Sequence, residues 1–370
     1  MSKPLTIEAQ RSLWTDAAAR LLRNKAAVAS LFVLGLLVLA SLLGPSLTGH
    51  PYDKVYTEYV KAEPQLSAYP RSDQIEPAVA RIAARMRARV EDTTISANTV
   101  TVVLASDRAI DQRSLAYFER TDMFGAPIIG AQSDDGQRLT LNVPVKRQRF
   151  LFGTDPNGRD LLTRTLVAIR ISLAIGLLAT SVALVIGVLY GATAGYFGGR
   201  VDAAMMRVVD ILYALPFIFF VILLVVFFGR NFVLMFLAVG AIEWLDMARI
   251  VRGQTLSIKR QEYVAAAEAL GVSTGGILRR HIIPNTLGPV VVYVTLLIPR
   301  VILLESFLSF LGLGVQEPMT SLGVLIAEGA RGIQTATYML FFPAIILIAL
   351  LSALNFVGDG LRDALDPRDR

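Results

Sequence analysis

Long stretches without a charged residue recur along this chain, and they constrain its fold more than any other feature. Residues 26–49, 171–199 and 211–229 contain no Asp, Glu, Lys or Arg. About 20 mainly apolar residues cross the ~30 Å hydrocarbon core of a bilayer as a helix, because a helix satisfies its own backbone hydrogen bonds there. The chain is therefore predicted to span a membrane several times, and its mean hydropathy of +0.54 agrees.

We expect an all-α polytopic membrane protein with six transmembrane helices. In chain order, the expected spans are 26–48, 171–199, 211–229, a span starting near 232, 284–304 and 337–357. Pro216 lies inside the third span, which is tolerable when neighbours satisfy the freed carbonyl. The first run is too long for the core of a cleaved signal peptide, so we prefer an uncleaved anchor.

The basic residues predict the orientation of these spans. Outside the 50–150 segment, most Lys and Arg fall in 1–25, 200–207, 249–283 and the C-terminal tail. Six spans place all of these on one side, and loops rich in Lys and Arg stay in the cytoplasm. We therefore expect a multi-pass protein of the bacterial inner membrane with both termini cytoplasmic. The 50–165 and 307–336 segments are then periplasmic.

Residues 50–150 form a polar block that differs from the rest of the chain. The block holds 14 Lys/Arg and 13 Asp/Glu. Its apolar residues 75, 79, 82, 86 and 90 recur at helical spacing after a cap at Ser72 or Asp73, whereas 99–104 and the alternating residues 139, 141, 143 and 145 are typical of strands. We predict an α+β extracytoplasmic insert. It either helps to dock a solute-binding protein or acts as a spacer.

The composition excludes several classes of function. The chain has no cysteine and only two histidines, His50 and His281, so thiol chemistry, disulfides and a His-based metal site are not expected. No basic stripe interleaves with aromatic residues, which argues against nucleic-acid binding. No Lys follows a Gly, so the end of a phosphate-binding P-loop is absent. We therefore expect no catalytic residues and no cofactor bound by this chain.

The loop between the fourth and fifth spans is the most informative segment. Within the run from Lys259 to Gly271, a short Ala-rich helix is predicted to stop at Gly271, and a second short helix leads to Pro284, which opens the next span. A short helix with small side chains has little reason to form unless another surface packs closely on it. The pattern therefore indicates a partner protein.

This loop resembles the EAA loop of ABC importer permeases. Ala266, Ala267, Gly271 and Pro284 fit the spacing of that motif, while its usual glutamate falls on Ala265. Four further segments resemble the C-type permease subunit of the oligopeptide/dipeptide family: FGTDPNGRDLLTR (152–164), AGYFGGRVDAAMMRVVDILYALP (194–216), ESFLSFLGLGVQEP (305–318) and GDGLRDALDPR (358–368). The resemblance covers roughly 15–48 and 150–368, and leaves out the insert.

The resemblance implies a division of labour among subunits. Such a permease pairs with a sister permease as a heterodimer, receives a peptide from a periplasmic solute-binding protein, and couples to two cytoplasmic ATPase subunits that bind ATP and Mg²⁺. The implied coupling-loop residues are Glu262, Ala265, Ala266, Ala267, Glu268, Gly271 and Pro284. The implied domains are 1–25 (cytoplasmic segment), 26–48 (first span), 50–150 (periplasmic insert), 151–360 (permease core with coupling loop 253–283) and 361–370 (cytoplasmic tail).

Four charged residues interrupt the apolar runs: Glu243 and Asp246 in the cytoplasmic half of the fourth span, for which we prefer a structural role, and Arg300 and Glu305 in the outer half of the fifth. Intramembrane charges cost about 2.5–3.5 kcal/mol each at mid-bilayer, so they face protein or water. Asp246 is three residues from Arg249, so a local ion pair is available. Arg300 and Glu305 are about 140° apart around a helix and do not pair with each other. We take Arg300 and Glu305 as candidates for the translocation path, where charges meet the ends of a zwitterionic peptide.

Two other functions remain open from the sequence. The same scaffold serves a permease for nickel or another small solute. A stand-alone membrane transporter is the alternative from another class, although the six spans show no obvious internal repeat.

Overall fold

The computed structural model describes residues 13–229 and 232–365, so the first 12 residues of the predicted N-terminal segment and the last five of the tail lie outside it. The described chain divides into two compact units. Unit 1 comprises Met1–Gly44, Thr165–Arg331 and Pro343–Arg370, and unit 2 comprises Pro45–Arg164 and Gly332–Phe342. Unit 2 is therefore wider than the 50–150 insert expected from the sequence, and it includes a second segment far along the chain.

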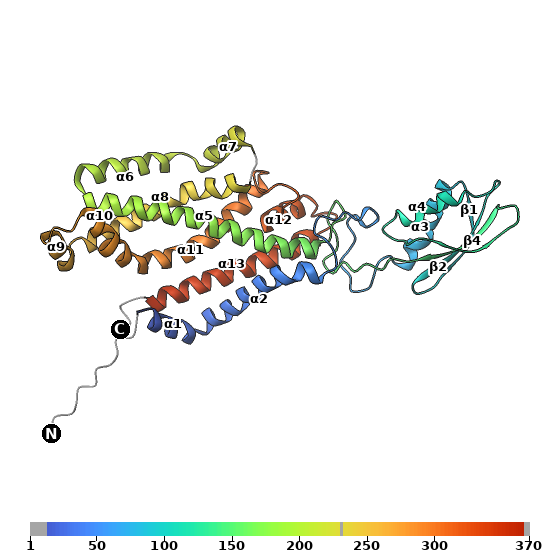
Figure 1. The fold of residues 1–370 in the computed structure, drawn as a ribbon, viewed down its shortest axis with the longest axis horizontal. Helices are drawn as coiled ribbons and strands as arrows, with labels where there is room; N and C mark the ends of the chain where they lie inside the picture. The colour runs from blue at the N-terminus through green and yellow to red at the C-terminus, as the bar shows by residue number, and fades with distance from the viewer. Residues whose placement is uncertain (1–12, 230–231, 366–370) are drawn as a thin grey trace, which may run out of the picture. The chain divides into compact units, whose positions relative to one another are not determined.

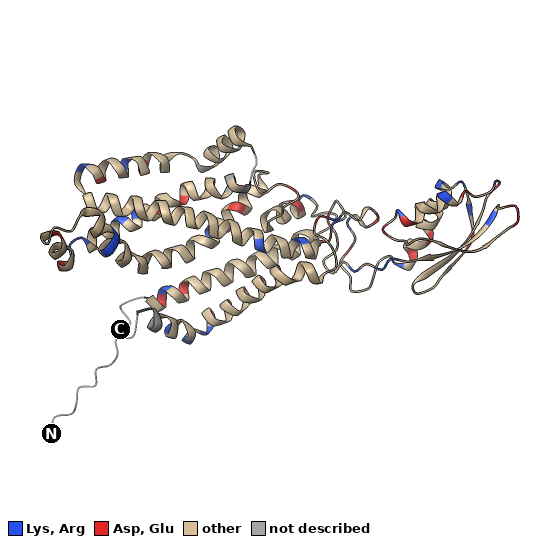
Figure 2. Ribbon diagram, viewed as in Figure 1, with Lys and Arg blue, Asp and Glu red and all other residues tan. Residues whose placement is uncertain are grey.

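Unit 1 is helical (Figure 1). Its helices in chain order are α1 (Leu13–Arg23), α2 (Lys25–Leu47), α5 (Leu161–Phe197), α6 (Gly199–Ala214), α7 (Phe217–Phe228), α8 (Phe232–Ile258), α9 (Glu262–Ala269), α10 (Thr274–Ile277), the π-helical turn η3 (Leu278–Ile282), α11 (Ile283–Phe310), α12 (Leu322–Arg331) and α13 (Tyr338–Leu365). The long helices carry few charges along most of their length (Figure 2). The end of α2 and the starts of α5 and α13 belong to unit 2.

Four helical runs in the described chain are long and apolar enough to cross a membrane. They are Lys25–Leu47, Leu161–Phe197, Thr274–Phe310 and Tyr338–Leu365, and the bent pair α6–α7 makes a fifth if it counts as one span. Only α8 is missing from the six spans expected from the sequence. It carries Glu243, Asp246 and Arg249 within its middle turns. The fifth expected span also begins earlier than predicted, because α10, η3 and α11 follow one another without a gap.

The expectation of one continuous helix over 211–229 is wrong. Helix α6 ends at Ala214 and α7 starts at Phe217, and the two axes differ in direction by 87°. Pro216 has no backbone N–H, and its ring disfavours the helical conformation in the preceding residue. Leu215 accordingly adopts extended backbone, with φ −75° and ψ 131°. Pro216 therefore breaks the helix rather than being absorbed within it.

Three glycines on α5 bring its backbone against α8. Gly187, Gly191 and Gly195 are spaced four residues apart, so they lie on one face of the helix. A Cβ atom at Gly191 would lie under 3.0 Å from the carbonyl oxygen of Ala248, and one at Gly195 would be as close to the carbonyl oxygen of Arg252. Small residues at such a contact let membrane helices approach closely. In Figure 1, α5, α8 and α11 run side by side.

Unit 2 contains a helix packed on an antiparallel sheet. Its elements are η1 (Thr57–Tyr59), α3 (Ser72–Arg85), β1 (Arg89–Ile95), β2 (Thr99–Ala105), η2 (Gln112–Leu115), α4 (Ala116–Glu119), β3 (Ile128–Gln132) and β4 (Arg138–Pro144). The strand order is β1-β2-β4-β3. Val100 pairs with Val143 and Val102 with Leu141, and these buried side chains join those of α3 in one apolar cluster.

The local sequence explains most of this unit. Ile75, Val79 and Ile82 are buried on one face of α3, as their spacing predicts. Val90, expected to continue that face, lies in β1 instead, because the helix ends at Arg85. The cap also differs, since Gln74 accepts a hydrogen bond from the amide of Arg71 at 3.0 Å, which makes Arg71 the N-cap residue rather than Ser72 or Asp73.

The 152–164 segment of unit 2 contains a buried ionic cluster. The Asp155 carboxylate is fully buried and accepts hydrogen bonds from Arg159 Nε at 2.6 Å and from Arg164 Nη1. It also accepts from the backbone amides of Asn157 and Arg159 at 2.8 and 2.9 Å. Buried charges persist in proteins when they are paired and hydrogen-bonded in this way. The charged residues of this segment therefore have a structural role within unit 2.

Candidate functional site

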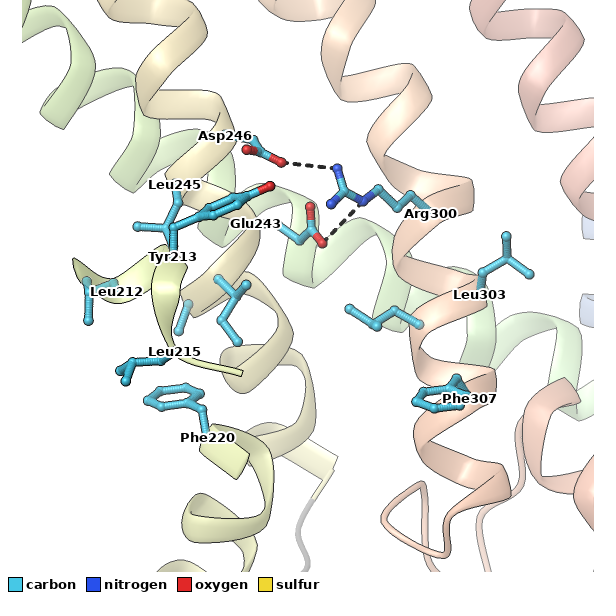
Figure 3. A pocket seen from close by; sticks show the side chains of 13 residues that line it. Leu212, Tyr213, Leu215, Phe220, Glu243, Leu245, Asp246, Arg300, Leu303 and Phe307 are labelled. Atoms are coloured by element: carbon cyan, nitrogen blue, oxygen red, sulfur yellow. Dashed lines mark hydrogen bonds and ion pairs between the residues drawn. The ribbon is translucent and has the colours of Figure 1, made fainter. Parts of the chain in front are cut away.

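A pocket of about 600 Å³ opens among α6, α7, α8 and α11 in unit 1 (Figure 3). Apolar side chains line the cavity from two sides, with Leu212, Leu215 and Phe220 on one side and Leu303, Leu304 and Phe307 of α11 on the other. One end is polar, and it is formed by Tyr213, Glu243, Asp246 and Arg300. Mostly apolar cavities of 300–1,000 Å³ with a few convergent polar groups are typical of ligand sites.

The polar end contains two carboxylates and one guanidinium. Arg300 Nη1 lies 3.2 Å from Asp246 Oδ2, and Arg300 Nε lies 3.5 Å from Glu243 Oε1. The three side chains together carry a formal charge of −1. The Arg300 side chain is 55% exposed, whereas that of Glu243 is only 4% exposed. Glu243 Oε2 is buried and has no hydrogen-bond partner within the described part of the chain. The cluster is thus unbalanced in charge and in hydrogen bonding.

The spacing of Glu243 and Asp246 along α8 places both carboxylates on the face of the helix that packs against α11. Glu243 and Asp246 are three residues apart, so they lie on neighbouring positions of one helix face. The two helices are held together by buried apolar side chains of one cluster, which includes Val239 on α8 and Leu297 and Val301 on α11. Arg300 projects from this contact between the two helices. The charged group therefore depends on tertiary packing and not on one segment.

The ion pairs in the structure differ from the pair that the sequence spacing suggested. Asp246 does not pair with Arg249. Instead, Arg249 Nη2 lies 2.9 Å from Asp210 Oδ1 on α6, and its guanidinium lies over the ring of Tyr213. The two predicted partners diverge because α6 and α11 offer each of them a better-placed opposite charge.

The two candidates for the translocation path are separated. Arg300 lines the pocket, whereas Glu305 is fully buried and is not among the lining residues. Glu305 Oε1 accepts hydrogen bonds from the hydroxyls of Ser309 and Ser321, each at 2.6 Å. Ser321 immediately precedes α12, so Glu305 ties that segment to α11. In agreement with the 140° separation, Arg300 and Glu305 do not contact each other.

The predicted coupling loop folds as α9, α10 and the π-helical turn η3, and residues 253–258 of it are still part of α8. Within α9, Glu262, Ala265, Ala266 and Glu268 are exposed, whereas Ala267 is buried. Pro284 is exposed near the start of α11. The alanines that the motif brings together thus have different surroundings, and Ala267 packs on the chain's own helices.

Gly271 ends α9 in the way the sequence indicates. Its φ of +75° favours glycine, because a Cβ is strained in the left-handed region. The amide of Gly271 bonds to the carbonyl of Glu268, and the amide of Val272 bonds to the carbonyl of Ala267. This pair of bonds is the Schellman motif of helix C-termini.

Polar contacts that the sequence analysis did not single out hold this region on the long helices. Tyr196 Oη on α5 donates to Glu268 Oε1 on α9 at 2.9 Å, and Lys259 Nζ, just after α8, donates to the Tyr196 carbonyl at 2.6 Å. Arg252 on α8 forms a two-point pair with Asp202 on α6, at 2.5 and 2.6 Å. Tyr196 and Asp202 lie in the 194–216 segment that carried part of the resemblance, which was the available signal.

Comparison with known proteins gives consistent matches along the whole chain. A family model described as "Binding-protein-dependent transport system inner membrane component" matches residues 183–370, and one described as "N-terminal TM domain of oligopeptide transport permease C" matches residues 12–66. The chain is 43% identical to the oligopeptide transport system permease protein OppC of Escherichia coli K12, covering 100% of this chain and 95% of that protein.

Other relatives have similar descriptions. The chain is 46% identical to the dipeptide transport system permease protein DppC of Bacillus subtilis, over 66% of this chain and 77% of that protein. Among solved structures, an inward-facing MetNI methionine ABC transporter chain aligns with a TM-score of 0.46 at 19% identity, covering 56% of this chain and 96% of that chain.

Proposed function

Because this chain belongs to the family of binding-protein-dependent transport system inner membrane components, and within it to the oligopeptide permease C group, we propose that it is a permease subunit of an ATP-driven peptide importer. The end-to-end identity of 43% with an oligopeptide permease carries this proposal. The relatives are transport permeases, and in such systems separate ATPase subunits hydrolyse ATP. This chain then forms half of the path for the peptide.

We further propose that the chain crosses the bacterial inner membrane six times, through α2, α5, α6–α7, α8, α11 and α13. Helix α8 spans despite its charges because Glu243 and Asp246 meet Arg300 within the protein, which lowers the cost of burying them. Both termini and α9 are then cytoplasmic, as the distribution of Lys and Arg predicts. Unit 2, with its α3 helix and small sheet, is then the periplasmic insert.

In this proposal, α9 docks on an ATPase subunit. Its exposed residues, together with Leu270, which is 84% exposed, supply the contact surface. Ala267 and the Tyr196–Glu268 hydrogen bond connect α9 to the chain's own long helices. Movement of the ATPase would therefore be transmitted to α5 and to the chain's other long helices rather than bend the loop alone.

The partners that complete the importer are a sister permease, two ATPase subunits and a periplasmic binding protein. Arg300 lines the path, and we assign Glu305 the role of holding the segment before α12 on α11. The solute is a peptide, since the relatives that match the chain are named for oligopeptide and dipeptide transport.

A purification experiment tests the assembly. The tagged full chain is isolated from its native membrane in mild detergent, and the co-purifying proteins are identified. A second permease and one or two P-loop ATPases are expected. Recovery of the chain alone would contradict the proposal and favour a stand-alone transporter.

A transport experiment tests the solute and the coupling loop. The purified complex is reconstituted with its binding protein in vesicles, and ATP-dependent uptake of a labelled tripeptide is compared with uptake of Ni²⁺. Gly271→Ala strains the C-terminus of α9 and should lower peptide uptake several-fold. Gly275→Ala, where a Cβ would meet open space, is the matched control. Uptake of Ni²⁺ without uptake of peptide would overturn the assignment of the solute.

A further inference from the structure

We infer that the acidic end of the pocket, formed by Glu243 and Asp246, receives the terminal ammonium group of the transported peptide, while the adjacent apolar wall receives its first side chain. This inference rests on the proposed function, because it concerns the solute of the same transporter. Nothing in the family membership assigns a role to these two acids.

The charge of the cluster selects an ammonium group over a carboxylate. Two carboxylates outweigh the single guanidinium of Arg300, so an incoming carboxylate meets net repulsion and an incoming cation meets net attraction. Arg300 is already engaged on both sides, at 3.2 and 3.5 Å. It orients the acids rather than acting as an anion site.

The hydrogen-bonding state of Glu243 points in the same direction. Glu243 lines the cavity, and its Oε2 is buried without a hydrogen-bond partner among the described residues; an unsatisfied buried acceptor on a charged group is costly. An ammonium group brings three donors and no acceptor. It satisfies Glu243 Oε2 and still has donors for the Asp246 carboxylate, whose side chain is 23% exposed.

The rest of the pocket suits a short peptide segment that begins at that point. Figure 3 shows Leu303 and Phe307 following Arg300 along α11, with Leu215 and Phe220 across the cavity. An apolar surface beside one charged end accommodates varied side chains without hydrogen-bond readout. The site thus recognises what all peptides with a free amino terminus share.

A cross-linking experiment tests where the peptide terminus lies. The reconstituted importer turns over ATP with a tripeptide that carries a photo-reactive leucine either at its first or at its third position. We expect the first-position probe to label α11 near Leu303 and Phe307, and the third-position probe to label this segment at least fivefold less. Equal labelling by the two probes, or no labelling of the pocket, would overturn the inference.

Uptake by charge variants tests the role of the acid. Glu243→Gln keeps the shape of the side chain and should lower uptake about tenfold, which is the scale of one lost charged hydrogen bond, and it should reduce cross-linking of the first-position probe. Asp210→Asn is the matched control, because Asp210 pairs with Arg249 outside the lining of the pocket. Its uptake should stay within about twofold of wild type.

The remaining outcomes are distinguishable. If Glu243→Gln assembles and transports like wild type, the inference fails while the proposed function stands. If Glu243→Gln loses the sister permease during purification, the acids belong to a contact between subunits, which also overturns the inference. If the assembled wild-type complex takes up no peptide at all, the proposed function itself fails.

Discussion

Asp155 and Glu305 are both completely buried carboxylates, but different partners hold them. Asp155 accepts hydrogen bonds from two arginines and two backbone amides, so its negative charge is compensated locally. Among residues 13–229 and 232–365, Glu305 accepts from the hydroxyls of Ser309 and Ser321, which carry no charge. The consequences of removing each carboxylate differ accordingly, since the first supports an ionic cluster and the second a contact between α11 and the segment before α12.

Replacing Asp155 should destabilise the protein strongly. Asp155→Asn removes the charge that Arg159 and Arg164 both contact, and breaking a buried ion pair costs about 3–5 kcal/mol. We expect a clearly lower apparent melting temperature for the purified chain. Asp134→Asn, on an exposed turn, should leave it unchanged. Equal melting temperatures for the two variants would show that the cluster contributes little.

Asp160 should make stability depend on pH. Burial raises the pKa of its carboxyl above the usual value of about 3.9, against the lowering effect of hydrogen bonds from Thr163 and of the charge of His50, while Asp155 raises it further. The folded state then keeps this proton to a higher pH than the unfolded chain. Its contribution to stability is therefore full at low pH and is lost as the pH rises through the raised pKa.

The measurement is the apparent melting temperature between about pH 4 and pH 7, for wild type and for Asp160→Asn. The wild-type value should fall more steeply with rising pH than the value for the variant, which has no carboxyl to ionise at this position. Parallel curves would contradict the expected shift.

At the level of single residues, the sequence was enough to identify the charged side chains within the membrane spans. It was not enough to predict the residues with which they form ion pairs. Their place inside apolar runs identified Glu243, Asp246 and Arg300 as charges within spans that must face protein or water. It paired Asp246 with Arg249, because only contacts within one helix can be counted from a sequence. The partner on α11 depends on how two helices pack, and no local rule gives that.

The glycines of α5 show how the sequence of one helix determines how closely a neighbouring helix can pack on it. Gly187, Gly191 and Gly195 leave no room for a side chain between α5 and α8. Glycine inside a helix costs about 1 kcal/mol relative to alanine, so close contact between the two helices is the compensating gain. The face that they form is therefore a packing surface.

Enlarging that face should separate the two helices. In Gly191→Ala, the added methyl group meets the backbone of Ala248, which cannot yield without moving α8, and overpacking of this kind costs about 1–3 kcal/mol. Gly253→Ala is the control, because it adds the same methyl group to α8 in open space. Thermal unfolding of the detergent-purified chain should rank Gly191→Ala below wild type and Gly253→Ala at or above it.

Elements with a strong repeating pattern were predictable, and those without one were not. Helix α3 and strand β4 follow from the helical and the alternating spacing of apolar residues, and strand β2 from its run of β-branched residues. Strands β1 and β3 were missed: β1 has no fully buried position and β3 is exposed throughout, so neither has an apolar alternation to detect. The break at Pro216 is a matter of context, since a proline either bends a membrane helix or ends it.

The path of the chain through its two units gives a topology that labelling can test. The chain has no cysteine, so a single introduced cysteine reports its own accessibility. In the proposed orientation, a membrane-impermeant maleimide added to spheroplasts should label Asp134→Cys on unit 2. It should label Arg260→Cys, next to α9, only after the membrane is permeabilised. Labelling of both positions, or the reverse order, would rule out the orientation.

The joint between α6 and α7 has a mechanical consequence. Leu212 and Tyr213 stand on one side of Pro216 and Phe220 on the other, and all three border the same cavity. A change in the 87° angle between the two helices would therefore alter the part of the cavity that these side chains border. A solute that fits one angle better than another stabilises that angle, and the angle in turn sets the affinity for the solute. Solute binding in the cavity and the angle between α6 and α7 are therefore thermodynamically coupled.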